Sequence, residues 1–95
     1  MSLCFEWDPR KASANLGKHG VGFDEACTVF ADPLAAIFDD EDHSPYQARE
    51  IIIGHSLAHR VLVVCFVEKP GDLIRIFSAR LATKKERKDY EEAHG

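Results

Sequence analysis

A chain of 95 residues, 45% of them hydrophobic, can form one small domain with a single core, and this composition excludes a disordered chain. Its formal net charge of −4 argues against a protein that is basic throughout, as many nucleic-acid-binding proteins are. No apolar run approaches the roughly 20 residues of a membrane-spanning helix. The first residues also lack the basic start and apolar core of a signal peptide. We therefore expect a single domain over 1–95 in the cytoplasm, without a membrane partner.

The N-terminal third predicts one strand followed by two helices. Residues 3–7 (LCFEW) are apolar and aromatic and contain no breaker, which is typical of a short strand. A helix is expected over 9–19, because Asp8 suits the N-cap position and Gly20 suits the left-handed position that ends a helix. Apolar residues at helical spacing predict a second helix over 24–30.

The remaining chain predicts a meander of strands and a C-terminal helix. The strands are expected at 33–38, 49–56, 59–68 and 73–80. Residues 62–67 (LVVCFV) are apolar on both faces, so their strand should lie centrally in the sheet. The turn KPGD at 69–72 should join the last two strands in antiparallel fashion. Thr83 and Glu86 have the spacing of a capping box, which predicts that a helix begins there. The predicted fold class is α+β, with a mostly antiparallel sheet.

Basic side chains gather near the end of this acidic chain. Residues 75–88 contain six Lys and Arg residues and one acidic residue, so the chain can present a locally positive surface. Arg75 lies in the middle of an apolar strand, where it forms a salt bridge with an acidic residue of a helix, faces solvent at an edge or faces an anion. Arg80 ends the strand and suits a phosphate, which a guanidinium group can bind through two hydrogen bonds. Arg49 begins another strand and could join them, although a lone arginine there is usually solvated.

His19 differs from the other four histidines because it follows a cationic residue, Lys18, and precedes the helix-ending Gly20. An imidazole can exchange protons near neutral pH, as general acid–base catalysis requires. Basic side chains in the last turn also stabilise the negative end of the helix dipole. The pattern alone leaves both interpretations open.

The sequence predicts no metal site and no covalent nucleophile. The acidic run DDEDH at 39–43 matches the ligand spacing of neither a calcium loop nor a zinc site, and is expected to be a solvated turn. Ser56 and Ser78 lack a recognisable His–acid arrangement, and there is no glycine-rich phosphate loop. Widely spaced cysteines among apolar neighbours are expected to be buried free thiols: Cys4, Cys27 and Cys65.

Four stretches, covering about residues 5–91, together resemble the BrnT family of bacterial type II toxins: FEWDPRKASANLGKHGVGF at 5–23, REIIIG at 49–54, LVVCFVE at 62–68 and LIRIFSARLATKKERKDYE at 73–91. The matching motifs are F-E-W-D at 5–8, K-x-x-x-N-x-x-K-H-G-V at 11–21, I-R-I-x-S-A-R at 74–80 and E-R-x-x-Y at 86–90. There are two departures from the family pattern. Phe77 replaces a more usual aliphatic residue, and Gly22 stands where a small hydroxyl residue is common.

The resemblance implies a fold similar to the RelE toxins and an endoribonuclease that stops growth by cutting RNA. It also implies neutralisation by a BrnA-like antitoxin, whose DNA-binding part would link the pair indirectly to operator DNA. The positions that match the family's functional residues are Lys18, His19, Arg49, Arg75, Ser78 and Arg80. Of these, Arg49 and Ser78 are expected to bind the RNA.

The implied reaction needs no metal and no cofactor, because the 2′-OH of RNA is itself the nucleophile. It needs proton transfer and positive charge at the phosphate. We assign proton transfer to His19 and stabilisation of phosphate charge to Lys18 and Arg80, with Arg75 as a further stabiliser or orienter. Two alternatives remain open at this point: a catalytically inactive homologue that acts as binding partner and co-repressor with the antitoxin, and a small metal-binding protein.

Overall fold

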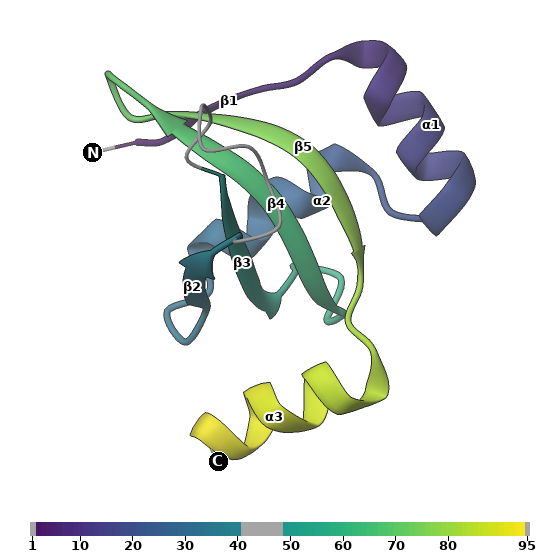
Figure 1. Ribbon diagram of the computed structural model, residues 1–95, viewed down its shortest axis with the longest axis vertical. Helices are drawn as coiled ribbons and strands as arrows, with labels where there is room; N and C mark the ends of the chain where they lie inside the picture. The colour runs from purple at the N-terminus through teal and green to yellow at the C-terminus, as the bar shows by residue number, and fades with distance from the viewer. Residues whose placement is uncertain (1, 41–48, 95) are drawn as a thin grey trace.

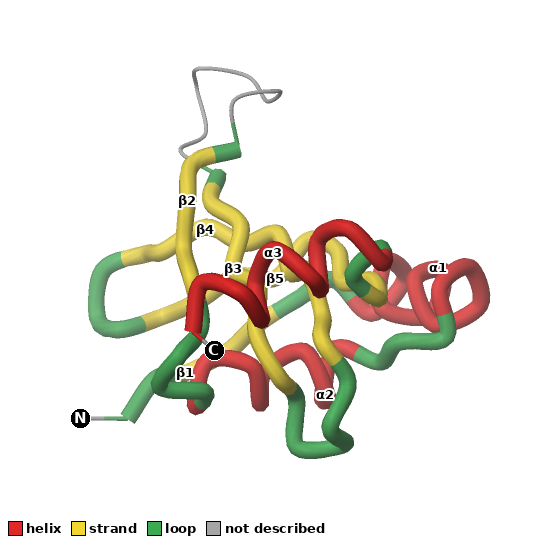
Figure 2. The backbone as a smooth tube through the Cα atoms, turned by 90° about the horizontal axis from the view of Figure 1, so that it is seen from below, coloured by secondary structure: helices red, strands yellow, loops and turns green. Residues whose placement is uncertain are grey.

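The computed structural model describes residues 2–40 and 49–94 and has the predicted α+β architecture (Figure 1). Its elements are β1 (Cys4–Glu6), α1 (Pro9–His19), α2 (Phe23–Thr28), the 3-10 helix η1 (Val29–Ala31), β2 (Ala36–Asp39), β3 (Glu50–His55), β4 (Val61–Lys69), β5 (Leu73–Leu81) and α3 (Lys84–His94). One twisted sheet forms the centre of the molecule, α2 lies along one face of it, and α3 extends beyond the end of β5 (Figures 1 and 2).

The five strands form one mixed sheet in the order β1-β5-β4-β3-β2. The antiparallel meander from β2 to β5 is confirmed, and the apolar strand β4 is central, as predicted. The exception is β1, which pairs with β5 in parallel, with Cys4 opposite Leu73 and Glu6 opposite Arg75. A parallel pair needs a long connection, and here both N-terminal helices and three strands separate the partners in sequence.

Local capping signals set the ends of α1 as predicted. Asp8 is the N-cap, and its carboxylate accepts a 2.8 Å hydrogen bond from the backbone N–H of Arg10. Gly20 adopts φ 68°, and its N–H donates to the carbonyl of Leu16 at 2.9 Å. His19 is therefore the last helical residue.

Strand β2 begins later than predicted. Residues 33–35 form a turn rather than strand, because Asp32 caps them: its side chain accepts from the N–H of Leu34 at 2.9 Å, and its carbonyl accepts from the N–H of Ala35 at 3.1 Å. Only Ala36–Asp39 pairs with β3. The sequence pattern placed the strand correctly but missed this local hydrogen-bonded turn.

The main core lies between the sheet and the two N-terminal helices. Its fully buried side chains include Val21, Val29, Leu62, Val64 and Phe66. Burying one such side chain stabilises the fold by about 1.5–3 kcal/mol, so this cluster accounts for most of the driving force for folding.

A smaller cluster on the opposite face of the sheet holds α3. Tyr90 of α3 packs there against Ile53 and Val63, and its hydroxyl donates to the carboxylate of Asp32 at 2.5 Å. Burial, together with the adjacent carboxylate, raises the pKa of Tyr90 to about 12. The tyrosine of the E-R-x-x-Y motif thus anchors the helix to the turn that follows η1.

A β-bulge in β5 breaks the alternation of its side chains. Cys65 of β4 pairs with Ser78 and Phe66 pairs with Ile76, so Phe77 has no partner on β4. In a regular strand, neighbouring side chains point to opposite faces. The bulge instead leaves Ile76 and Ala79 in the same core and turns both Phe77 and Ser78 to the other face.

Asn15 joins α1 to the outer edge of β5. Among the described residues, β1 pairs with β5 only as far as Arg75, which leaves the backbone beyond it without a strand partner on that side. The amide of the buried Asn15 donates to the carbonyl of Ala79 at 2.7 Å and accepts from its N–H at 3.1 Å. It also donates to the carbonyl of Val21 at 3.0 Å. These bonds fix the C-terminal half of α1 beside Ser78.

The prediction of three buried thiols is wrong for Cys4, which is exposed. Strand β1 is a short edge strand, and its alternation buries Phe5 against Phe30 while Cys4 points away from the core. The other two thiols are free and at least partly buried. Within the described residues, no helix is long and apolar enough to cross a membrane.

Candidate nucleic-acid interface

The outer face of the sheet carries a cavity of about 470 Å³ lined by three cations, an aromatic ring, a hydroxyl and a carboxylate. These side chains are Lys11, Arg49, Arg80, Phe77, Ser78 and Asp40. They come from α1, from β5 and from the segments that flank the paired strands β2 and β3. Residues far apart in sequence therefore meet because the meander brings β3, β4 and β5 side by side.

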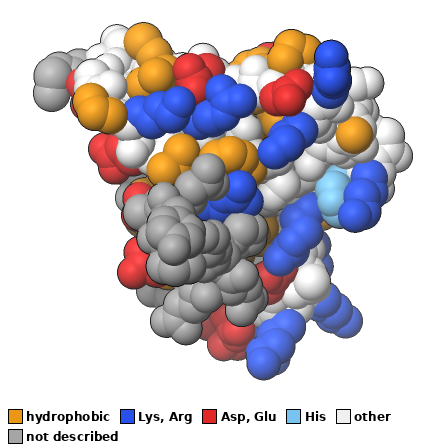
Figure 3. Space-filling model, turned by 45° about the horizontal axis from the view of Figure 1, so that its top comes forward, with side chains coloured by type: hydrophobic (Ala, Val, Ile, Leu, Met, Phe, Trp, Pro, Cys, Tyr) orange, Lys and Arg blue, Asp and Glu red, His pale blue; other side chains and the backbone are white. Residues whose placement is uncertain are grey.

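A second cavity of about 230 Å³ lies against α1 and includes the two residues at its end, Lys18 and His19. Lys11, Phe77 and Ser78 line both cavities, so the two adjoin. We call the pair of cavities the groove. Figure 3 shows Lys and Arg side chains gathered on one face of the molecule beside a histidine.

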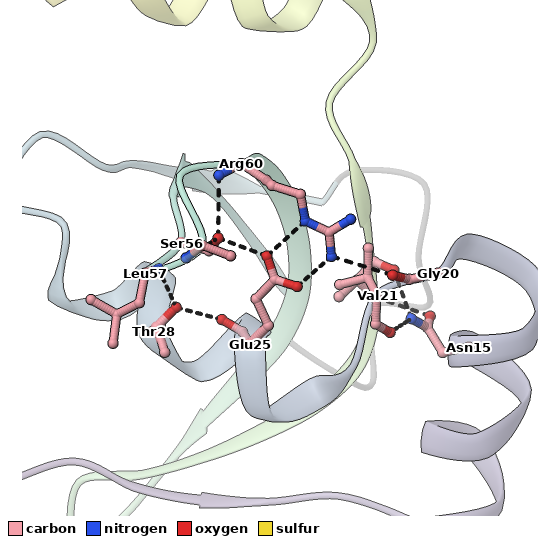
Figure 4. Close-up of polar contacts among 10 residues, drawn as sticks. Asn15, Gly20, Val21, Glu25, Thr28, Ser56, Leu57 and Arg60 are labelled. Carbon is pink, nitrogen blue, oxygen red and sulfur yellow. Dashed lines mark hydrogen bonds and ion pairs between the residues drawn. The ribbon is translucent and has the colours of Figure 1, made fainter.

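The backbone that follows α1 is held from two sides, which fixes the end of the helix that carries Lys18 and His19. Asn15 binds the carbonyl of Val21, and the guanidinium of Arg60 donates to the carbonyl of Gly20 at 3.2 Å (Figure 4). The backbone that follows His19 is therefore bonded both to its own helix and to the start of β4. Lys18 and His19 end the helix and line the groove at the same time.

Arg60 is itself held by Glu25 of α2, as Figure 4 shows. Its Nε donates to the carboxylate of Glu25 at 2.9 Å, its Nη2 pairs with the other oxygen, and the hydroxyl of Ser56 donates to Glu25 at 2.7 Å. The ion pair with Arg60 lowers the pKa of Glu25. This network explains Ser56, which serves as a structural hydrogen-bond donor and lies outside the groove.

Arg80 lines the groove and is paired with a carboxylate from α3. Its guanidinium donates to both oxygens of Glu86, at 2.7 and 3.0 Å. Glu86 also completes the predicted capping box, since it accepts from the N–H of Thr83 at 2.8 Å while its own N–H donates to the Thr83 hydroxyl at 3.1 Å. The capping box is confirmed, and the binding of its glutamate to Arg80 was not predicted.

The Arg80–Glu86 pair predicts a loss of stability in acid. The hydrogen bonds from Arg80 lower the pKa of Glu86 from 4.5 to about 2. A lowered carboxyl pKa stabilises the folded state above the unfolded pKa, and that stabilisation is lost as the pH falls from 4.5 toward 2. Because the Glu86 side chain is 34% exposed, solvent screens the pair and its contribution should be about 1 kcal/mol.

Urea denaturation of wild type and Glu86→Gln at about pH 6 and about pH 2.5 tests this prediction. The wild type should be more stable than Glu86→Gln at the higher pH, and this difference in stability should be much smaller at the lower pH, which approaches the folded pKa of Glu86. Glu92→Gln is the matched control, since the pair that Glu92 forms with Lys88 is 3.9 Å long and exposed. If the difference in free energy of unfolding between wild type and Glu86→Gln did not change with pH, the Arg80–Glu86 pair would not be the source of the stabilisation.

Arg75 lies apart from the groove, toward β1. Its guanidinium donates to the carboxylate of Glu6 at 2.8 Å, and Lys69 binds the same oxygen at 2.9 Å. A salt bridge was one of the three interpretations left open by the sequence, but its partner was expected on a helix and lies instead on the neighbouring strand β1. Arg75 lines neither cavity of the groove.

Arg49 and Lys11 both lie over the ring of Phe77. The guanidinium carbon of Arg49 is 4.0 Å from the ring centroid, and the ammonium nitrogen of Lys11 is 5.5 Å from it. A cation within about 6 Å of a ring face is attracted by the electron density of that face. The ring therefore attracts two cations of the groove through its electron-rich face.

Neither a metal cluster nor a reactive thiol is found in the groove as far as the structure describes it. Over residues 2–40 and 49–94, no three metal-ligating side chains come together. Most of the acidic run at 39–43, including His43, lies outside the described residues. The thiol of Cys65 donates to Asp40 at 3.6 Å, and burial raises its pKa to about 11, which keeps it protonated at neutral pH.

Lys11, Asn15 and Phe77 are groove residues to which the sequence analysis gave no role. Lys11, Asn15 and Lys18 are spaced i, i+4 and i+7, which places them on one face of a helix. That spacing was a usable signal for Lys11 and Asn15. Alternation also places Phe77 on the face opposite Ile74 and Ile76, but it does not reveal that the bulge brings Ser78 to that face as well.

The fold and the groove define a class: a small α+β domain that presents clustered cations and a histidine on one face of its sheet. A family model for the ribonuclease toxin BrnT of type II toxin–antitoxin systems matches residues 7–86. The chain belongs to this BrnT family of ribonuclease toxins.

A solved structure supports the fold assignment. The chain is similar to the 1.1 Å crystal structure of the Brucella abortus ribonuclease toxin BrnT, with a TM-score of 0.68 and 21% sequence identity over 87% of this chain and 100% of that one. At this level of identity the likeness concerns the fold alone. A comparison with curated proteins gave no match.

Proposed function

We propose that this protein is an endoribonuclease toxin that cuts RNA in the groove by metal-independent attack of the 2′-OH, and thereby inhibits translation and growth. One observation carries the proposal: His19 and four cations, Lys11, Lys18, Arg49 and Arg80, line two adjoining cavities. An anionic polymer is the ligand that such a cluster favours.

In the proposed reaction, the 2′-oxygen forms a bond to phosphorus while the bond from phosphorus to the 5′-oxygen breaks. A base removes the proton of the 2′-OH, and an acid supplies a proton to the departing 5′-oxygen. His19 transfers one of these protons. Lys18 and Arg80 stabilise the negative charge that builds up on the phosphate oxygens.

The remaining residues bind and orient the RNA in this proposal. Arg49 and Ser78 contact the substrate, because both line the larger cavity and Ser78 lines both. Arg75 acts as a further stabiliser or orienter at the margin, where Glu6 holds its guanidinium. The products are a 2′,3′-cyclic phosphate and a 5′-OH.

We also propose that the protein works in the cytoplasm and is neutralised by a BrnA-like antitoxin. It reaches operator DNA only through that antitoxin. Membership of a type II toxin–antitoxin family supports an antitoxin partner. The strand meander flanked by helices also supports a kinship with the RelE toxins.

Incubation of RNA with the purified protein, free of antitoxin, tests the proposal. We expect cleavage at the same rate with Mg²⁺ and with EDTA. Cleavage that stops in EDTA and returns with Mg²⁺ would contradict a metal-independent reaction.

The alternative of an inactive co-repressor partner has one observation in its favour. Two of the proposed catalytic cations are already neutralised, Arg80 by Glu86 and Arg75 by Glu6. In that case, the purified protein would leave RNA intact under both conditions and still bind its antitoxin. The same incubation therefore separates the two functions.

A further inference from the structure

Phe77 is the one aromatic side chain that lines the groove in the described part of the chain, and it lines both cavities. It is only partly buried although it is apolar. The bulge in β5 lets Phe77 and Ser78 face the groove together, because a regular register would turn one of the two toward the core. The fold thus presents an apolar ring beside two cations, Lys11 of α1 and Arg49, which precedes β3.

A ring in this position offers a surface that the cations lack. Phosphate groups are bound by positive charge, whereas the flat face of a nucleobase stacks on an aromatic side chain. Arg49 lies 4.0 Å from the ring centroid, and the guanidinium plane can extend such a stack. Lys11 is exposed and 5.5 Å away, on a long flexible side chain that can move to a phosphate.

We infer that Phe77 is the nucleobase platform of the groove, an inference that rests on the proposed RNA-cutting function and deepens it. The ring stacks one unpaired base of the RNA, the guanidinium of Arg49 extends the stack, and Lys11 binds a neighbouring phosphate. Bases inside a duplex are covered by their neighbours on both faces, so the platform selects single-stranded RNA. Stacking tolerates any base, so Phe77 gives affinity and register with little sequence preference.

The competing explanation is that the ring only positions Arg49 and Lys11. The two explanations differ for a ligand that has phosphates and no bases. We would measure binding of two short 2′-deoxy oligonucleotides, which the proposed reaction cannot cut: one of mixed sequence and one with abasic residues throughout. The proteins are wild type, Phe77→Leu and Phe77→Tyr, with Phe38→Leu as control. Phe38 is 50% exposed and does not line the groove.

We expect Phe77→Leu to raise the Kd for the base-bearing oligonucleotide by about 5- to 150-fold, as removal of one stacked base would. It should leave the Kd for the abasic oligonucleotide unchanged. Phe77→Tyr and Phe38→Leu should bind both as the wild type does. Circular dichroism of each variant confirms that it is folded.

Equal weakening of both oligonucleotides by Phe77→Leu would overturn the inference, because the ring would then act only through the cations. The inference would also be overturned if Phe77→Leu bound both oligonucleotides with the Kd of the wild type. Ring-dependent binding by a wild-type protein that cuts no RNA would support the platform and contradict the proposed cleavage. Cleavage of RNA by the wild type, combined with oligonucleotide binding that does not depend on Phe77, would support the proposed cleavage and contradict the platform.

Discussion

Replacing His19 with alanine is expected to lower the rate constant of RNA cleavage by about 10²–10⁴-fold, the range typical for loss of a proton-transferring side chain. His19 is the sole histidine among the described groove residues, and the carbonyl after it is fixed by Arg60. The substitution removes the imidazole while α1 keeps its cap at Gly20. Single-turnover cleavage of a labelled RNA measures the effect.

Leu16→Ala is the matched control for His19→Ala. Leu16 lies in the same helix, is 55% exposed and lines neither cavity. Its replacement should leave the cleavage rate close to that of wild type. A folded His19→Ala protein that cuts as fast as wild type would return the Lys18-His19 pair to a purely structural role at the helix end.

Replacing Asn15 with leucine is expected to destabilise the fold by about 2–4 kcal/mol, because a buried polar group left without its partner costs about 1–3 kcal/mol. The side chain is 7% exposed and makes three hydrogen bonds, two to the backbone of Ala79 and one to Val21. Leucine fills a similar volume and bonds to none of these groups. The melting temperature should fall by about 10–25 °C.

Thermal unfolding followed by circular dichroism measures this loss, with Gly17→Ala as the control in the same helix. A Cβ at Gly17 meets no atom within 4 Å, and alanine favours a helix more than glycine does. The control should melt no lower than wild type. If Asn15→Leu melted within about 2 °C of wild type, Asn15 would not be what fixes α1 to β5.

Local chemistry explains what could be predicted of the fold. Asp8 and Gly20 bound α1, and the Thr83–Glu86 box starts α3, because capping depends on residues only a few positions apart. The apolar run 62–67 is central because only a strand covered on both faces needs apolar residues at every position. Each of these features is readable from a short window of sequence.

The features that were not predicted depend on contacts between distant residues. The parallel pairing of β1 with β5 joins Cys4 to Leu73, and no local pattern encodes it. The bulge at Phe77 is a one-residue change of register that reverses which side chains face the groove. Strict alternation would have put Arg75 and Arg80 on opposite faces of the sheet.

The candidate site, like the fold, could be predicted only in part. The family motifs named Lys18, His19, Arg49, Ser78 and Arg80, and the structure brings them to one groove. Arg75 lies outside it, because Glu6 on the neighbouring strand binds its guanidinium. The sequence alone does not reveal the ion pair of Arg75 with Glu6, since the two residues are 69 positions apart.

The ends of the RNA fragments provide the most direct measurement of the central claim, that the 2′-OH attacks the phosphate within this groove. RNA cut by the purified protein in EDTA should carry a 2′,3′-cyclic phosphate on one fragment and a 5′-OH on the other, as mass spectrometry and labelling by polynucleotide kinase can show. Fragments with a 5′-phosphate, formed only when Mg²⁺ is present, would contradict it.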